Sequence, residues 1–196
     1  MGWSRAVAAV VGAGALAAGV VGCTGDDPGA GPSPSPSASV STSVSPTPEP
    51  TAAPVAPVLP AAARKATEAG ARAFIAYYWA LINYAQVTGD VKGLEKVSGP
   101  SCDGCKAGID GIVKIYRGGG QVSGSLERIS VDDLKSLTSK SSNAVAFHGV
   151  VTASHGSQTV TDGDGAKETR GPGSDTFDVY LLWVAKSWRL DVMAIR

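Results

Sequence analysis

The sequence has no excess of charge of either sign, few aromatic residues and only two histidines. Lysine and arginine number 17, as do aspartate and glutamate, so the formal net charge is zero. A neutral chain offers no broad electrostatic attraction for nucleic acid or for an anionic surface, and we predict no nucleic-acid partner. After Gly22, no apolar run approaches the roughly 20 residues that a membrane-spanning helix needs.

Several motifs that would carry chemistry are incomplete. Gly99-Pro100-Ser101-Cys102-Asp103 falls one residue short of the nucleophile motif G-x-S-x-G. Asp162-Gly163-Asp164-Gly165 resembles the start of a calcium loop, but Gly173 stands where an EF-hand places glutamate. Gly118-Gly119-Gly120 follows a predicted helix, so it indicates a helix end rather than a phosphate cradle. We therefore predict neither a metal nor a cofactor.

The N-terminus carries the clearest signal. An apolar segment, residues 6–21, follows a single positive charge at Arg5 and leads into Val20-Val21-Gly22-Cys23. This pattern is typical of a secretory signal, and its end resembles a bacterial lipobox, in which the cysteine receives a diacylglyceryl group. We predict a signal peptide at residues 1–22 and a lipid on Cys23. Two acyl chains give stable anchoring, so we expect the protein on the outer face of the cytoplasmic membrane.

Between Thr24 and Pro60 the composition changes abruptly, and ten of the twelve prolines lie here. They alternate with serine, threonine, alanine and valine, which bury too little apolar surface to offset the entropy lost on ordering. Proline also removes backbone donors from helices and sheets. We predict a lipid-anchored disordered stalk at residues 23–60 and one folded domain at residues 61–196. The composition leaves open whether the stalk carries O-linked sugars.

Three helices are predicted at the start of the domain. The apolar residues of the first recur at helical spacing: Phe74, Tyr77, Tyr78, Leu81, Ile82 and Ala85. They indicate a long helix from Ala61 to Val87, which Thr88-Gly89 ends. A short second helix follows around residues 91–97, and a third runs from Cys102 to Arg117.

After the three glycines the apolar residues alternate with a period of two. The alternation predicts strands at residues 121–131, 143–153, 177–185 and 188–195, the last two joined by a turn at Lys186-Ser187. The Gly- and Asp-rich residues 154–174 are interpreted as a long mobile hairpin loop, with or without short strand extensions. The pattern predicts an α+β fold, with three N-terminal helices packed on a curved antiparallel four-stranded sheet.

These motifs resemble two known groups. The long helix, the two shorter helices and the hairpin at Lys186-Ser187-Trp188-Arg189-Leu190 resemble the cone-like nuclear transport factor 2-like fold. The stretches 74–90, 101–105 and 116–119 resemble an uncharacterised family of actinobacterial surface lipoproteins. The resemblance covers about Ala61 to Arg196 and implies a fold and a cell-envelope address, without an activity.

Two cysteines remain if Cys23 carries lipid. Cys102 and Cys105 form a pair in a compartment where disulfides persist, and we favour a structural disulfide. Their spacing at a helix start also suits thiol–disulfide exchange, so a thiol-redox protein stays an alternative, although the βαβ context of thioredoxin-like proteins is missing. A zinc site needs two more ligands, and only His148 and His155 are available. We interpret both histidines as surface residues.

The resemblance to a cone-like fold also implies an apolar pocket, as in ketosteroid isomerases and polyketide cyclases. Tyr77, Tyr78, Asp110 and Trp183 are the candidate pocket residues, and Asp178 joins them only if its strand is turned over. A small-molecule enzyme or carrier is therefore a second alternative. Because no motif fixes a catalytic pair, we favour a non-catalytic binding or assembly module. Its partner would be an envelope protein or a small apolar ligand. The diacylglyceryl lipid on Cys23 would hold the module itself at the outer face of the membrane.

Overall fold

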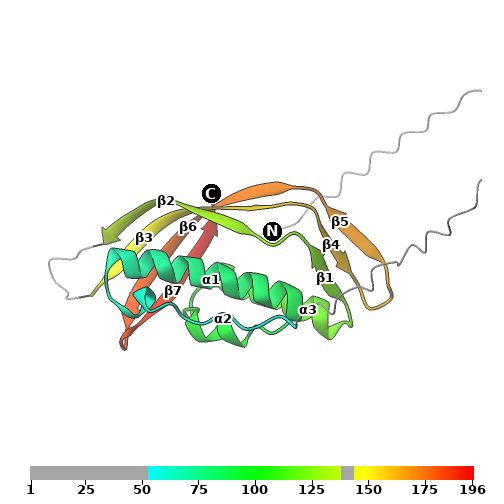
Figure 1. Ribbon diagram of the computed structural model, residues 1–196, viewed down its shortest axis with the longest axis horizontal. Coiled ribbons are helices and arrows are strands. Elements are labelled where there is room, and N and C mark those ends of the chain that lie inside the picture. The colour runs from blue at the N-terminus through cyan, green and yellow to red at the C-terminus, as the bar shows by residue number, and fades with distance from the viewer. Residues whose placement is uncertain (1–52, 138–143) are drawn as a thin grey trace, which may run out of the picture. The chain divides into compact units, whose positions relative to one another are not determined.

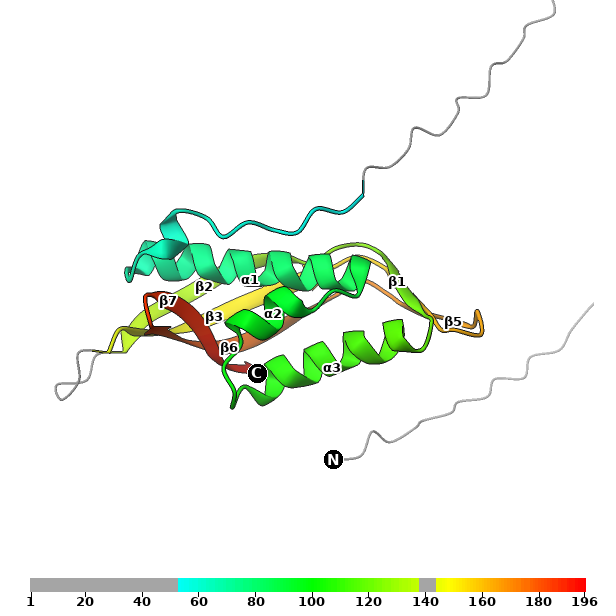
Figure 2. The ribbon, with the colours of Figure 1, turned by 90° about the horizontal axis from the view of Figure 1, so that it is seen from below.

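The computed structural model describes residues 53–137 and 144–196 (Figure 1). Residues 53–60 run in an extended line beside the first helix (Figure 2), and Leu59 packs against the core. A short 3-10 turn, Ala62–Arg64, follows. Its end is tied to the far end of the chain, because the indole Nε1 of Trp188 donates a hydrogen bond to the Lys65 carbonyl at 3.0 Å.

The first helix, α1, spans Glu68–Thr88 and is capped at both ends. The Thr67 hydroxyl accepts a hydrogen bond from the Gly70 amide at 3.1 Å, which satisfies a free donor of the first turn. Gly89 ends the helix with a φ of +74°, a left-handed conformation that favours glycine. The predicted helix is therefore present but begins later than Ala61, because the chain turns at residues 62–67 before Thr67 caps it.

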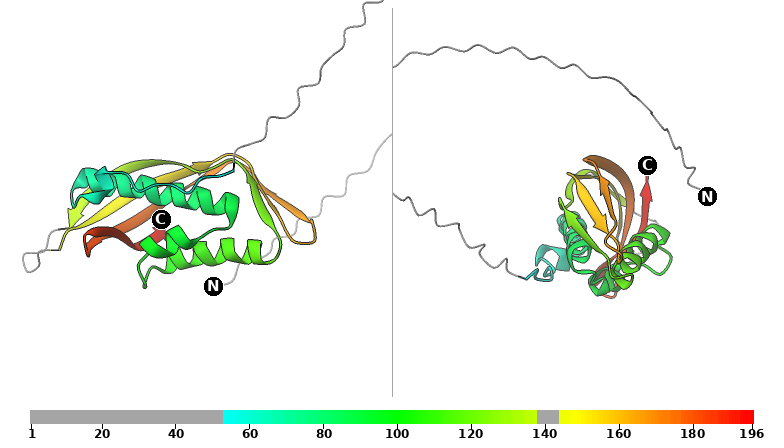
Figure 3. Two further views of the ribbon diagram at one scale, coloured as in Figure 1. Left: turned by 60° about the horizontal axis from the view of Figure 1, so that its bottom comes forward. Right: turned by 90° about the vertical axis from the view of Figure 1, so that its right-hand side faces the viewer.

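Two shorter helices follow, α2 at Lys92–Val97 and α3 at Asp103–Arg117, close to their predicted bounds. All three helices cover the same face of the larger of the two sheets that the strands form (Figures 1 and 3). Of the residues on the predicted apolar face of α1, Phe74, Tyr78, Leu81 and Ala85 are buried, whereas Tyr77 and Ile82 are half-buried. Ile75 and Trp79, which the spacing does not include, are buried as well. Burial of each such side chain contributes roughly 1.5 to 3 kcal/mol, so this face is the main attachment of α1 to the sheet.

The strands form two antiparallel sheets. The larger has the order β2-β3-β6-β7 and the smaller has the order β1-β4-β5. Their bounds are β1 Gln121–Gly124, β2 Arg128–Leu137, β3 Ala146–His155, β4 Gln158–Thr161, β5 Lys167–Arg170, β6 Gly173–Val184 and β7 Ser187–Ile195. The larger sheet is antiparallel and four-stranded as expected, but a second sheet accompanies it, and the predicted strand at residues 121–131 is divided between β1 and β2. Residues 154–174 contain a hairpin, β4–β5, and β4 pairs with β1 instead of lying in a loop.

Alternation along β3 and β6 separates the two faces of the larger sheet. Phe147 and Val151 on β3, with Val179 and Leu181 on β6, are buried beneath the helices. His148 lies on the opposite face from Phe147, as the alternation predicts. The β6–β7 turn falls one residue earlier than predicted, at Ala185-Lys186, and both residues have positive φ, as in two-residue hairpin turns.

Candidate functional site

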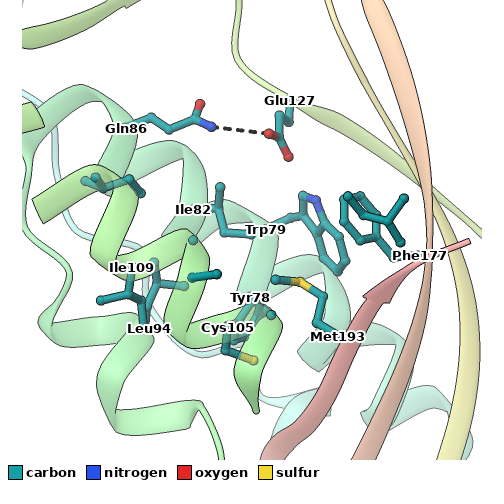
Figure 4. A pocket seen from close by; sticks show the side chains of 15 residues that line it. Tyr78, Trp79, Ile82, Gln86, Leu94, Cys105, Ile109, Glu127, Phe177 and Met193 are labelled. Atoms are coloured by element: carbon teal, nitrogen blue, oxygen red, sulfur yellow. Dashed lines mark hydrogen bonds between the residues drawn. The ribbon is translucent and has the colours of Figure 1, made fainter. Parts of the chain in front are cut away.

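A cavity of about 500 Å³ lies between α1, α3, β6 and the end of β7 (Figure 4). Each helix presents side chains at helical spacing to it. The α1 residues are Tyr78, Trp79, Ile82 and Gln86. The α3 residues are Gly104, Cys105, Ala107, Gly108, Ile109 and Ile112. Leu94, Phe177, Met193, Ile195 and Glu127 complete the lining, which is therefore apolar except where Gln86 and Glu127 meet.

Two glycines of α3 determine how the helix meets the strands. A Cβ atom at Gly104 would overlap the carbonyl oxygen of Met193, so only glycine allows this approach of α3 to β7. A Cβ atom at Gly108, one turn later, would have nothing within 4 Å. Helix and strand are thus in contact at Gly104, whereas Gly108, which lines the cavity too, is exposed and has room for a side chain.

Trp79 forms the wall opposite α3. Its side chain is only 2% exposed, and its ring packs edge to face on Phe177 with the centroids 5.8 Å apart. Among the described residues the indole Nε1 has no hydrogen-bond partner. A buried donor left unpaired costs roughly 1 to 3 kcal/mol, so this N–H is an unusual feature in the wall of a cavity.

Glu127 supplies the carboxylate at the polar end of the cavity. Asn83 holds its backbone from both sides: the Asn83 side chain donates to the Glu127 carbonyl at 2.9 Å and accepts from its amide at 2.8 Å. The Gln86 side chain then donates to the Glu127 carboxylate at 3.2 Å (Figure 4). Gln158 donates in turn to Gln86 at 3.3 Å, which fixes the Gln86 amide. The carboxylate is therefore held in place by α1 and β4.

Tyr78 lines the cavity with its ring but uses its hydroxyl elsewhere. The hydroxyl is hydrogen-bonded to the Ser98 hydroxyl at 2.9 Å. Burial raises the pKa of the Tyr78 phenol, and the bond to Ser98 opposes that rise only in part. The phenol is thus held neutral and already paired, which leaves it poorly placed to exchange a proton with a molecule in the cavity.

The predicted disulfide between Cys102 and Cys105 is present at the start of α3. Both residues are 2% exposed, and the Cys105 amide donates to the Cys102 sulfur at 3.3 Å. Cys105 also lines the cavity. Because both sulfurs are buried and bonded to each other, they provide no thiolate ligand for zinc. The disulfide closes a four-residue loop at the first turn of α3.

Of the four predicted pocket residues, Tyr78 lines the cavity and the other three do not. Tyr77 is half-buried beside Phe74. Asp110 is exposed and pairs with Lys106 one turn earlier on α3. Trp183 packs on Trp188 with their ring centroids 5.2 Å apart. Cys23, the predicted lipidation site, lies outside the described residues.

A second polar cluster lies on the face of the larger sheet opposite the helices. His148 on β3 and Asp178 on β6 are 2.6 Å apart, and Arg196 donates to the other Asp178 oxygen at 2.9 Å. These two bonds, first His148 and then Arg196, lower the pKa of the Asp178 carboxyl. Tyr180 stacks beside His148. No sequence motif indicates this pair, because it depends on the register of β3 with β6.

The remaining chemistry of the described residues is limited. Within residues 53–137 and 144–196, no three His, Cys, Asp or Glu side chains are grouped so that they could hold a metal ion. In the same part of the chain, none of the helices combines the length and the apolar character of a membrane span. Asp162, in the suspected calcium loop, instead accepts backbone hydrogen bonds from Asp164 and Ala166 and shapes the β4–β5 turn.

Fold and cavity together define the protein as an α+β domain with an apolar pocket between its helices and its sheet. Residues 45–194 match the model of DUF6318, a family of unknown function, and the chain belongs to this family. No curated protein matches the chain.

The solved structures that are similar to the chain include the following two. The intermembrane space region of the chloroplast protein ARC6 has a TM-score of 0.46 and 15% identity, over 66% of this chain and 96% of that chain. Aln2 from a Streptomyces species has a TM-score of 0.38 and 16% identity, over 67% of this chain and 93% of that chain. At these values neither structure indicates a function for this chain.

Proposed function

We propose that the protein is a lipid-anchored cell-envelope protein whose α+β domain binds a small apolar molecule without transforming it. The anchor rests on the sequence, where a secretory signal meets Val20-Val21-Gly22-Cys23. The cone-like nuclear transport factor 2-like fold and the actinobacterial lipoprotein family that the motifs resemble fit this proposal. In it, the part of the predicted stalk before residue 53 holds the domain away from the outer face of the cytoplasmic membrane, since residues 53–60 lie along α1.

The cavity is the observation that carries the binding function. Pockets for small molecules enclose roughly 300 to 1,000 Å³, are mainly apolar and carry a few fixed polar groups. The cavity between α1 and α3 has about 500 Å³, aromatic and aliphatic walls, and one polar end at Gln86 and Glu127. An apolar molecule that entered it would gain roughly 25 cal/mol for each Å² of its surface removed from water.

The groups in the wall favour binding over catalysis. Tyr78, Cys105 and Glu127 are the lining residues that carry acidic or nucleophilic groups. The Tyr78 hydroxyl is bonded to Ser98 and Cys105 is in a disulfide, so Glu127 is left without a neighbouring proton donor or nucleophile among the lining residues. The lining therefore offers Glu127 alone as a catalytic base, with no acid or nucleophile beside it among the described residues. The buried disulfide likewise gives thiol exchange no accessible sulfur.

The binding function can be tested with an apolar dye and two matched variants. N-phenyl-1-naphthylamine, which fluoresces in apolar sites, is titrated into the full chain. Gly108→Leu places a side chain in the open space beside the cavity, while Gly111→Leu adds the same side chain to the same helix away from it. We expect the dye to bind the unmodified chain and Gly111→Leu alike, and to bind Gly108→Leu at least about tenfold more weakly. Equal binding to all three, with circular dichroism showing them folded, would contradict the proposal.

The anchor has a separate test. Cys23→Ala removes the thiol that would carry the lipid, so we expect the variant in the soluble fraction or as uncleaved precursor. A serine-to-alanine change at Ser33, in the predicted stalk, serves as the control. If the Cys23→Ala protein still incorporates radiolabelled palmitate and keeps its cleaved size, the anchor assignment fails.

A further inference from the structure

At the polar end of the cavity, one hydrogen-bond donor has no partner among the described residues, and one acceptor group has a single partner there. The donor is Nε1 of Trp79, which has no partner among the described residues although its ring is almost completely buried. The acceptor is the Glu127 carboxylate, whose hydrogen bond within the described chain comes from Gln86. Figure 4 shows the indole nitrogen turned toward the end of the cavity where Gln86 and Glu127 lie. A bound molecule with a matching group would complete both.

The charge of the lining limits which head group of a ligand can form hydrogen bonds with both Trp79 and Glu127. Among the described residues, no lysine, arginine or histidine lines the cavity, and Glu127 is the one residue in its wall with a carboxyl group. An anionic head group would bring a second negative charge next to Glu127 in an apolar site without a cation from the described lining, which is strongly unfavourable. A cationic head group would suit Glu127 but would present only donors to the indole N–H, which needs an acceptor.

From this arrangement we infer that the ligand is an uncharged amphiphile with an apolar body and a terminal hydroxyl group. A hydroxyl oxygen accepts one hydrogen bond and donates another. Because Nε1 of Trp79 is itself buried, the ring turns slightly to let the hydroxyl accept from it. The hydroxyl then donates to the Glu127 carboxylate, while the body lies along Ile82, Ile109 and Met193. This inference rests on the proposed binding function and adds the chemical class of the ligand to it.

The test compares head groups on one chain length. Decanol, decanoate and decylammonium each displace N-phenyl-1-naphthylamine from the full chain at pH 7. We expect decanol to displace the dye at a concentration about tenfold lower than decanoate, because a buried charge without a partner costs more than a lost hydrogen bond. Decylammonium should fall between them.

Two variants assign the effect to the two polar groups. Trp79→Phe removes the indole N–H and keeps an aromatic ring, so decanol should bind about tenfold more weakly while decane is affected less. Glu127→Gln keeps a hydrogen-bonding side chain and removes the charge, so decanoate should gain affinity. Asp110→Asn is the matched control, because Asp110 is exposed on α3 outside the cavity.

The outcomes separate the two proposals. If the dye binds and Gly108→Leu abolishes its binding, but decanoate or decylammonium binds more tightly than decanol, the cavity is a binding site and the hydroxyl inference is wrong. The same holds if Trp79→Phe leaves the decanol affinity unchanged. If the dye does not bind the unmodified chain and no decane derivative does either, the proposed function fails and the inference fails with it.

Discussion

Gly104 and Gly108 of α3 predict opposite effects for the same substitution. Gly104→Ala places a Cβ atom against the Met193 carbonyl oxygen. The two atoms would be much closer than 3.0 Å, the shortest distance that real Cβ atoms keep from other heavy atoms. The helix and β7 must therefore separate by about 1 Å, and such overpacking costs roughly 1 to 3 kcal/mol. Gly108→Ala meets nothing within 4 Å. It should stabilise the protein by up to about 1 kcal/mol, the difference between the helix propensities of alanine and glycine.

The two variants should therefore differ by about 2 to 4 kcal/mol in the free energy of unfolding. For a domain of this size that difference corresponds to roughly 10 °C in Tm. Thermal and urea denaturation of the full chain, followed by circular dichroism, measures it. Gly111→Ala is the control, because its Cβ also has open space around it, and it should behave like Gly108→Ala. Equal Tm values for Gly104→Ala and Gly108→Ala would refute the close approach of α3 to β7.

Three further predictions follow from the core and the turns. Burial raises the pKa of Tyr78 above 10.0, so the unfolded chain loses its proton first and stability should fall as the pH rises past about 10. Urea titrations between about pH 9 and 11 should show a smaller fall in the free energy of unfolding for Tyr78→Phe than for the unmodified chain. At pH 7 this variant should be less stable by about 1 kcal/mol, because it lacks the bond to Ser98. The same fall with pH in both proteins would contradict this. Replacing Cys102 and Cys105 by serine should cost about 2 kcal/mol, the value for closing so short a loop; free thiols in the unreduced native protein would disprove the disulfide. Lys186→Gly should raise Tm, because glycine adopts the φ of +65° without strain; a lower Tm would argue against that turn.

The helices were predictable because each carries its own signals. The apolar face of α1 from Phe74 to Ala85 and the glycine after Thr88 are visible in the sequence alone. The start of α1 was placed too early, since alanines at 61–63 favour a helix until the Thr67 cap is recognised. Local capping thus decided a boundary that periodicity did not.

The smaller sheet was only partly predictable, since β1 lies within the predicted strand at residues 121–131 but β5 has no signal of its own. All four residues of β5, Lys167–Arg170, are exposed and polar, so they show no alternation of apolar and polar side chains. Their strand conformation comes from pairing with β4, and β4 pairs in turn with β1. Pairing between distant segments is a tertiary effect that strand propensity does not report.

The cavity was only partly predictable for a similar reason. Tyr78 lies on the apolar face of α1 and was an obvious candidate. Trp79, the next residue, belongs to the same wall, but nothing in the sequence shows that its N–H lacks a partner among the described residues. The space lies between α1, α3 and strands β6 and β7, which are distant in sequence, so no local pattern reports it. The His148–Asp178 pair was missed because strand parity places both residues on one face without giving the register between them.

The bond from Trp188 to the Lys65 carbonyl determines how mechanical tension would enter the domain. It joins residues 123 positions apart, and Trp188 lies on β7 at the edge of the four-stranded sheet. A pull on the chain before Leu59 is therefore shared between the sheet edge and the helix, and does not act on the first turn of α1 alone. Such a junction lets the segment before it be stretched while the hydrophobic core beneath α1 remains folded.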